Sequence, residues 1–186
     1  MEPGSGEGAF AKEGERILRR GHLVTLAEGT FRGPDGTRFD REIVHHPGAV
    51  SVVPLVDDET VLLVRQYRAA VEVELLEIPA GKRDVAGEAP DATAQRELVE
   101  EVGRRAGSLE ELARFHNSPG FCDEHSIVYL GRDLQPASRD PHGVEEQHMA
   151  VETVALAEVE PMITDGRITD AKTIIGLLLA VRRVRA

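Results

Sequence analysis

Residues 88–103 read EAPDATAQRELVEEVG and predict a helix that packs on a core through one face. Pro90 suits the first helical position, where its missing N–H costs nothing, and Gly103 is favoured just past a helix end. Apolar residues recur every four positions, which is the spacing of a buried stripe. The residues of this stripe are Ala94, Leu98 and Val102.

The same predicted helix carries three carboxylates, those of Glu97, Glu100 and Glu101. Residues three and four apart share a helix face, so these side chains converge and repel by about 0.2–0.5 kcal/mol per pair. A hard divalent cation prefers carboxylate oxygens and would remove that repulsion. Arg96 can pair with Glu100 one turn away and can also reach back to Glu88. The two interpretations are a metal site on a rigid helix and a solvated acidic face.

This segment resembles the Nudix box, which reads Gly, five residues, Glu, seven residues, then Arg-Glu-aliphatic-any-Glu-Glu-any-Gly-aliphatic. The matching positions are Glu88, Arg96, Glu97, Leu98, Glu100, Glu101 and Gly103. Two positions depart from the pattern. Gly81 lies one residue too far from Glu88, so the loop at 82–87 carries an insertion, and Arg104 stands where an aliphatic residue is usual. Neither departure involves a carboxylate, so the resemblance favours the metal site.

Three further motifs resemble the ADP-ribose pyrophosphatase branch of that family. They are RQYR at 65–68 with EIPAG at 77–81, SPGFCDE at 118–124, and DAKTIIG at 170–176. Pro119 is the feature most associated with ADP-sugar hydrolysis, and the insertion before Glu88 is similar to that of actinobacterial members. The resemblance covers nearly the whole chain after residue 15.

The resemblance also implies a metal centre and the residues that support it. The implied metal ligands are Glu97, Glu100, Glu101 and the backbone carbonyl of Ala80. The implied ion is Mg²⁺, with Mn²⁺ as a substitute. Arg96 and Glu88 would fix the carboxylates from behind, and Arg96 and Glu100 are also counted as catalytic residues.

The general base of this branch comes from a loop outside the box. The candidate loop is DPHGVEEQHM at 140–149, where Pro and Gly interrupt regular structure. Counted back from the apolar strand that starts at Met149, Glu146 best matches the family's base and Glu145 is the second choice. His148 stands where some members carry another acidic residue. Without the resemblance, both glutamates would be interpreted as solvated loop charges.

The resemblance implies substrate contacts as well. Arg68 resembles the arginine that pairs with the pyrophosphate, for which a planar donor fork is suited. Glu124 resembles the residue that accepts hydrogen bonds from the terminal ribose hydroxyls. The adenine would be bound by Arg41, Glu42 and His22, with His22 in place of a stacking phenylalanine. An ordinary polar strand residue is an equally good interpretation of His22.

The remaining chain predicts an α+β protein, the Nudix fold, with a mixed β-sheet between helices. Strands at 22–31 and 39–44 form an N-terminal hairpin, and a second hairpin is predicted at 49–56 and 60–66. Further strands are predicted at 74–79, 114–116, 126–131 and 149–155, with helices at 156–164 and 170–185. We expect a flexible tail at 1–14, an N-terminal β-strand region at 15–48 that serves dimerisation and the adenine pocket, and a Nudix catalytic domain at 49–186.

Composition limits the partners and the compartment. Lys+Arg 22 against Asp+Glu 33 gives a net charge of -11, which argues against nucleic-acid or membrane-surface binding. The single Cys122 excludes an intrachain disulfide and fits a reducing cytoplasm, and no signal peptide or long apolar run is present. The resemblance implies a homodimer whose subunits exchange N-terminal strands.

The expected activity is Mg²⁺-dependent hydrolysis of ADP-ribose to AMP and ribose 5-phosphate. One alternative is a Nudix hydrolase of another nucleoside diphosphate derivative, namely a GDP-sugar, NADH or a dinucleoside polyphosphate. Another is a sensor that binds ADP-ribose without cleaving it. Sensors of that kind usually carry a DNA-binding domain and lose box carboxylates, whereas this acidic chain keeps them all.

Overall fold

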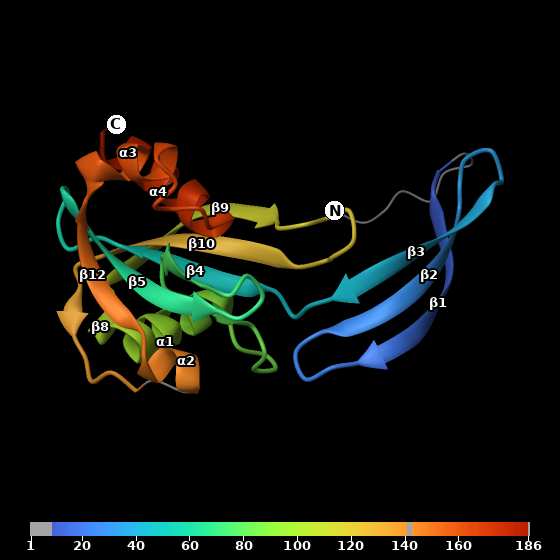
Figure 1. Ribbon diagram of the computed structural model, residues 1–186, viewed down its shortest axis with the longest axis horizontal. Coiled ribbons are helices and arrows are strands. Elements are labelled where there is room, and N and C mark those ends of the chain that lie inside the picture. The colour runs from blue at the N-terminus through green and yellow to red at the C-terminus, as the bar shows by residue number, and fades with distance from the viewer. Residues whose placement is uncertain (1–8, 141–142, 186) are drawn as a thin grey trace. The chain divides into compact units, whose positions relative to one another are not determined.

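Residues 9–140 and 143–185 are described by the computed structural model, and they divide into two units (Figure 1). The N-terminal unit contains the chain up to Gly48 together with His116–Glu124. The main unit contains Ala49–Phe115 and the chain from His125 onward. Among the described residues, no helix is both long and apolar enough to cross a membrane.

The N-terminal unit is built on a three-stranded antiparallel sheet. Its strands are β1 (Ala11–Arg20), β2 (Thr25–Arg32) and β3 (Arg38–His45), in that order across the sheet. The expected flexible tail at 1–14 is therefore wrong from Ala11 onward, and residues 1–8 of that tail lie outside the described residues. The expected hairpin is the β2–β3 part of a larger sheet.

The sequence pattern does not predict strand β1, because the strand has no alternation of apolar and polar residues. Every residue of it is exposed, and pattern-based prediction of a strand depends on one buried face. Backbone pairing with β2 and cross-strand ion pairs hold β1 instead. Glu13 pairs with Arg32 and Arg38. In the adjoining turn, the N–H of Gly21 donates to Val24 at 2.8 Å, so His22 lies in a turn and not in the expected strand.

The main unit contains a mixed sheet, as predicted. One sheet has the order β7 (Ala80–Lys82), β4 (Ala49–Pro54), β10 (His125–Arg132) and β9 (Ser108–His116). Strand β4 pairs parallel with β10 and antiparallel with β7. A second sheet has the order β12 (Ala150–Ala155), β5 (Thr60–Arg68) and β6 (Val73–Glu77). A short pair joins β8 (Arg104–Arg105), which contains the atypical Arg104, to β11 (Gln135–Pro136).

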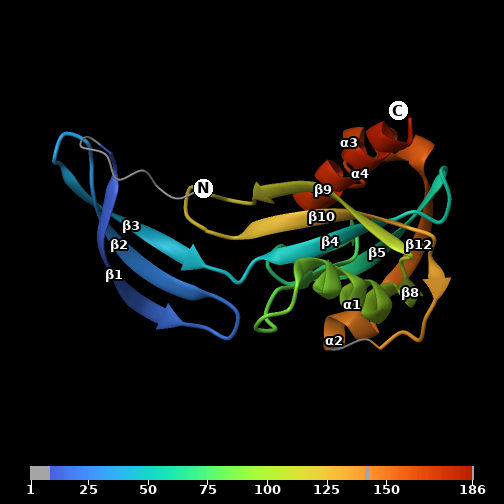
Figure 2. The same ribbon diagram turned by 180° about the vertical axis from the view of Figure 1, so that it is seen from behind.

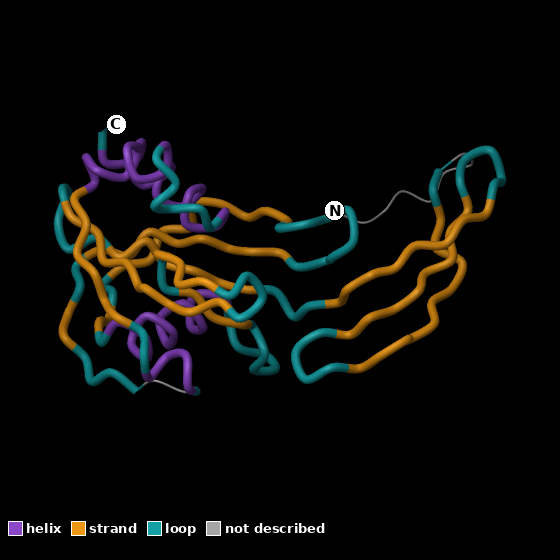
Figure 3. Tube along the Cα trace, viewed as in Figure 1, coloured by secondary structure: helices purple, strands orange, loops and turns teal. Residues whose placement is uncertain are grey.

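Helices cover both sides of these strands (Figures 2 and 3). One side carries α1 (Pro90–Val102) and the short α2 (Val144–Gln147). The other carries the 3₁₀ turn η1 (Leu156–Glu158), α3 (Val159–Thr164) and α4 (Ala171–Val184). Alternation along β4 explains this arrangement, because successive strand residues face opposite sides. Val52 packs in the cluster of Leu98 from α1, and Val53 packs in the cluster of Leu177 from α4.

Strands β4 and β5 do not form the predicted hairpin. The turn between them is real, since Leu55 bridges Val61 and the N–H of Val56 donates to Thr60 at 2.9 Å. Beyond that turn the two strands belong to different sheets. Strand β4 pairs in parallel with β10, which is far from it in the sequence. The local sequence around β4 does not indicate such a long-range partner.

The segment at 140–149 is also more regular than predicted. Both candidate bases, Glu145 and Glu146, lie on the short helix α2 and not in a loop. Gly143, with a positive φ of 92°, immediately precedes this helix. The sequence of α2, VEEQ, is rich in good helix formers, which explains the difference. Two residues of the predicted loop, Pro141 and His142, lie outside the described residues.

Candidate active site

Helix α1 begins and ends where the sequence predicts. Pro90 is at its start, and Gly103 at its end is left-handed with φ 67°. The N–H of Gly103 donates to Val99 at 2.9 Å, which satisfies a terminal carbonyl. Ala94 and Leu98 are completely buried, so the core fixes the rotation of the helix. The face that carries Glu97 and Glu101 is therefore held in one orientation.

Glu97 packs directly onto the backbone of β7. Its residue is only 8% exposed. A Cβ atom on Gly81 would lie 1.8 Å from Cδ of Glu97 and 2.1 Å from its Oε1. A side chain at position 81 would therefore force the Glu97 carboxylate out of this position, so glycine keeps the carboxylate against β7 even though the spacing to Glu88 is one residue longer than usual. The extra residue lies in the connection before α1, where the N–H of Glu88 donates to Val85 at 3.2 Å.

Glu101 is held by the neighbouring residue of the same strand. It is 3% exposed, and its Oε2 accepts a hydrogen bond from the N–H of Ala80 at 3.0 Å. Segment 80–81 thus contacts both buried carboxylates of α1. The structure places Ala80 beside Glu101 through its N–H, and the role of its carbonyl as a metal ligand stays a prediction.

Arg96 makes the contacts that the helix spacing predicts. Its Nη1 donates to Glu97 at 2.8 Å and to Glu100 at 3.0 Å. Its Nε and Nη2 donate to the two carboxylate oxygens of Glu88, each at 3.3 Å. The hydroxyl of Thr93 donates to Glu88 at 2.7 Å, which fixes that carboxylate from a second side. Arg96 therefore organises the acidic face of α1.

Burial changes the acidity of the two inner carboxyl groups. Burial raises the pKa of Glu97 to about 7, with Arg96 opposing the shift and Glu100 and Glu146 adding to it. Burial likewise raises the pKa of Glu101 to about 8, against the opposing N–H of Ala80. The charges of Glu97 and Glu146 add to the shift of Glu101. The positive groups of the protein thus do not fully offset the negative charge of these two carboxylates.

The three predicted carboxylates are held by different partners, and their role as a common set of metal ligands stays a prediction. Within residues 9–140 and 143–185, no three His, Cys, Asp or Glu side chains form a ready-made metal site. Arg96 draws Glu97 and Glu100 toward itself, while Ala80 holds Glu101. Glu97 and Glu101 nevertheless fit a hard divalent cation. They are buried oxygen donors one turn apart, and a cation would remove the cost of their charge.

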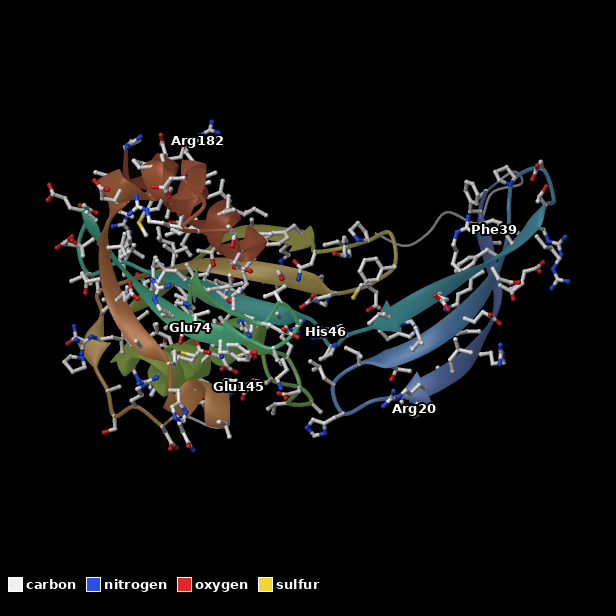
Figure 4. The ribbon with its side chains drawn as sticks, in the orientation of Figure 1. Arg20, Phe39, His46, Glu74, Glu145 and Arg182 are labelled. Atoms are coloured by element: carbon white, nitrogen blue, oxygen red, sulfur yellow. The ribbon has the colours of Figure 1, made fainter. Side chains whose placement is uncertain are left out.

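The candidate base lies within electrostatic reach of these carboxylates. Figure 4 labels Glu145 on α2, and the next residue, Glu146, raises the pKa of both Glu97 and Glu101. Nη2 of Arg139 donates to the backbone carbonyls of Glu146 and Met149, at 3.1 and 3.2 Å. Arg139 thereby ties the end of α2 to the chain before it.

A hollow of about 750 Å³ borders α1 beside Arg96 and Glu100. Its other wall includes Arg105, Arg139 and Asp140, so side chains of both charges line the space next to the acidic face.

Arg68 has an ion-pair partner that the sequence did not reveal. Its Nε and Nη2 donate to the two oxygens of Glu77, at 2.7 and 2.6 Å. Lys172 at the start of α4 also contacts Glu77. Glu77 lies in the motif at 77–81 and Lys172 in the motif at 170–176. The sequence alone does not show that these two motifs are in contact. The role of Arg68 toward a pyrophosphate stays a prediction.

The remaining predicted substrate residues belong to the N-terminal unit. Arg41 lies over the ring of Phe39, 4.8 Å from its centroid. Glu42 lies opposite Glu28 of the neighbouring strand β2 in the sheet register. Adjacent strand residues point to opposite faces. Arg41 and Glu42 therefore point to opposite faces of β3, and His22 lies in the turn between β1 and β2. A pocket shared with a partner subunit stays a prediction.

Glu124 lies at the end of the segment 118–124 predicted to contact the ribose. Its carboxylate is 3.5 Å from Nδ1 of His46, which Figure 4 labels near the end of β3. Its neighbour Asp123 accepts from the N–H of His46 at 2.8 Å. The N–H of Val44 donates to Phe121 at 2.8 Å, so this segment is tied to β3 by backbone bonds as well.

His45 adds a charged clamp between β1, β3 and segment 118–124. Its Nδ1 is 2.5 Å from Asp123 and its Nε2 is 3.0 Å from Glu15. The hydrogen bond to Asp123 raises the pKa of His45, burial opposes the shift, and Glu15 adds to it. Because the folded pKa lies above the unfolded value of 6.5, this stabilisation is complete below pH 6.5 and is lost as pH rises through the folded pKa.

We therefore expect His45→Gln to lower the melting temperature at pH 6 and to change it little at pH 9. The clamp is partly exposed, so a difference of about 1 kcal/mol, or about 2–4 °C, is expected at pH 6. Differential scanning calorimetry at both pH values measures it. His116→Gln, at an exposed histidine, serves as the control. An equal loss at both pH values would contradict the clamp.

The family model of the NUDIX domain matches residues 45–175. The chain belongs to the Nudix family. The Nudix fold predicted from the box is thus confirmed. The box helix is α1, and the match extends from the end of β3 into α4.

Two curated relatives of this Nudix chain are similar over most of their length. The ADP-ribose pyrophosphatase of Bacillus subtilis (strain 168) is 39% identical over 153 residues, which cover 82% of either chain. The ADP-ribose pyrophosphatase of Mycobacterium tuberculosis is 37% identical over 169 residues, covering 91% of this chain and 82% of the relative. A solved structure of an ADP compounds hydrolase shares the fold, with a TM-score of 0.84, 24% identity, and coverage of 98% and 97%.

Proposed function

We propose that this Nudix protein hydrolyses the pyrophosphate bond of ADP-ribose, with Mg²⁺ as cofactor, to give AMP and ribose 5-phosphate. The observation that carries the proposal is the buried pair Glu97 and Glu101 on the Nudix helix. The substrate is supported by the two ADP-ribose pyrophosphatases at 39% and 37% identity. The single Cys122 supports the cytoplasm as its compartment.

The residues proposed to hold the cation are those with oxygen donors next to segment 80–81. Glu97 and Glu101 would bind it, with Glu100 and the carbonyl of Ala80 as further ligands. A bound divalent cation neutralises the charge of a pyrophosphate, which otherwise repels an attacking water. Mn²⁺ is a substitute with the same preference for oxygen ligands. Arg96 and Glu88 keep the carboxylates in place through the hydrogen bonds described above.

Glu146 is proposed as the general base that takes the proton of the attacking water. Its charge acts on both Glu97 and Glu101, which supports a place for it near the carboxylate pair. Glu145 is the second candidate. Arg68 is proposed to donate to the pyrophosphate and Glu124 to accept from the terminal ribose hydroxyls. Arg41, Glu42 and His22 are proposed to bind the adenine.

Replacing Glu146 by glutamine is expected to lower kcat by about 10²-fold, the low end of what a general base contributes. Glu145→Gln is the matched control on the same short helix and should leave kcat within about threefold. Steady-state kinetics with ADP-ribose and saturating Mg²⁺ measures both. The reverse ranking would assign the base to Glu145, and two unaffected variants would remove α2 from the mechanism.

Hydrolysis of a substrate panel tests the proposed function. We would compare ADP-ribose, ADP-glucose, GDP-mannose, NADH and diadenosine polyphosphates, with Mg²⁺ and with EDTA. A clear preference for ADP-ribose that EDTA abolishes would support the proposal. Preference for another substrate would keep the Nudix chemistry and discard the ribose and adenine assignments. Binding of ADP-ribose without turnover would favour the sensor.

We further propose a homodimer in which the N-terminal strands are exchanged. The N-terminal unit exposes several large apolar side chains, which an interface would cover. They are Phe10, Ile17, Leu18, Leu23 and Val24. Light scattering measures the oligomeric state. A monomer that hydrolyses ADP-ribose efficiently would contradict a pocket shared between subunits.

A further inference from the structure

An ionic ring around the buried carboxylate of Glu77 connects the start of α4 to the strand segment beside the carboxylates of α1. Glu77, the last residue of β6, is 1% exposed and contacts both Arg68 and Lys172. Nζ of Lys172 also donates to Asp170 at 2.9 Å. A buried charge is tolerated only when it is paired and hydrogen-bonded, and Glu77 is held from two sides. Arg68 and Lys172 outweigh the effect of burial and lower the pKa of Glu77.

The ring closes through the cap of α4. Asp170 is the N-cap, and it accepts from the N–H of Thr173 at 3.0 Å and from its hydroxyl at 2.5 Å. The same hydroxyl oxygen accepts from the N–H of Ile78 at 3.0 Å. Thr173 is fully buried, so no water competes for these bonds. Helix α4 is thereby attached to the residue that follows Glu77.

The ring also determines how Arg68 is oriented. Glu77 occupies Nε and Nη2 of Arg68, which leaves Nη1 without a hydrogen bond to the described residues. The Arg68 side chain as a whole is 38% exposed, so part of it is open to solvent and to a ligand. The segment that carries Glu77 continues to Ala80, which donates to Glu101. Arg68 also interacts electrostatically with Glu101, which places its charge near the carboxylate pair.

We propose that Lys172, acting through Glu77, is a positioning residue that aims Nη1 of Arg68 at the pyrophosphate. The inference rests on the proposed function, in which Arg68 contacts that group. Oε2 of Glu77 is shared between Arg68 and Lys172, so the lysine fixes the carboxylate that the guanidinium fork must match. Because the guanidinium group is planar and rigid, its bidentate pairing with Glu77 also determines the direction of Nη1.

A double-mutant cycle tests the inference. The single variants are Lys172→Met, which removes the ammonium, and Arg68→Lys, which keeps a charge for Glu77 but removes the fork. We expect Arg68→Lys to lower kcat/KM for ADP-ribose by about 10- to 100-fold, chiefly through KM, and Lys172→Met by about 10-fold in the same way. Because Lys172 acts through Arg68, the double variant should be no slower than Arg68→Lys alone.

Two further variants separate positioning from folding. Lys172→Arg restores a cation and should recover most of the lost kcat/KM. Asp170→Asn keeps a residue that caps helices well and removes only the charge next to Lys172, so it provides a second cycle if Lys172→Met does not fold. Circular dichroism and melting temperatures establish that each variant is folded.

The outcomes are distinguishable. Absence of ADP-ribose turnover in the unmutated protein would overturn the proposed function and this inference with it. In an active enzyme, effects of Lys172→Met and Arg68→Lys that multiply in the double variant would overturn the inference alone. A Lys172→Met protein with lowered melting temperature but unchanged KM would also overturn it, since the lysine would then be structural.

Discussion

Replacing Gly81 by alanine is expected to reduce kcat/KM for ADP-ribose by more than about 10²-fold. The new Cβ atom would lie 1.8 Å from Cδ of Glu97, so the carboxylate must leave its position or the strand must move. A displacement of about 1 Å at a catalytic group is enough for a loss of that size. Steady-state kinetics at increasing Mg²⁺ measures it, and a raised Mg²⁺ requirement is expected because Glu97 is a proposed ligand of the cation.

Gly14→Ala provides the matched control for this variant. A Cβ atom there meets nothing within 4 Å, and Gly14 is not in the left-handed region. Its activity should therefore equal that of the unmutated protein. If Gly81→Ala were equally active, the contact between Gly81 and Glu97 would have no role in holding the carboxylate.

Replacing Glu101 by glutamine is expected to reduce kcat/KM by about 10³-fold while the protein stays folded. That loss corresponds to about 4 kcal/mol, within the several kcal/mol that a bound cation supplies to charge stabilisation. The amide oxygen can still accept the hydrogen bond from Ala80, so the local structure is retained. Turnover at saturating Mg²⁺ measures the effect, and an unchanged rate would mean that the metal lies elsewhere.

The same variant should differ from the unmutated protein in its pH-dependent stability. Burial raises the pKa of Glu101 to about 8 from a value of 4.5, so its ionised form opposes folding as pH rises above 4.5. In EDTA, Glu101→Gln should melt at a higher temperature than the unmutated protein near pH 8.5, and the gain should shrink as pH falls and disappear below pH 4.5. A lower melting temperature at pH 8.5 would show that the carboxylate is stabilising.

The box helix was predictable because its signals are local. Pro90 and Gly103 define its ends, and Leu98 with Ala94 defines its buried face within one segment. The pairing of Arg96 with Glu88 and Glu100 follows from helix spacing in the same way. Strand β1 had no such signal, because charges on both faces hide a strand that is stabilised through its backbone and ion pairs.

The sequence by itself determined the Nudix family, the α+β fold and the carboxylates of the box, since each depends on residues close together in the chain. Only the tertiary structure decided which of those carboxylates are buried and what holds them. Gly81 beneath Glu97, Ala80 beside Glu101, and Lys172 with Arg68 on Glu77 join segments far apart in sequence. Their meeting depends on the parallel pairing of β4 with β10 and on the packing of α1 and α4 against opposite faces of the strands. Such long-range packing is set by the whole core and by no single segment.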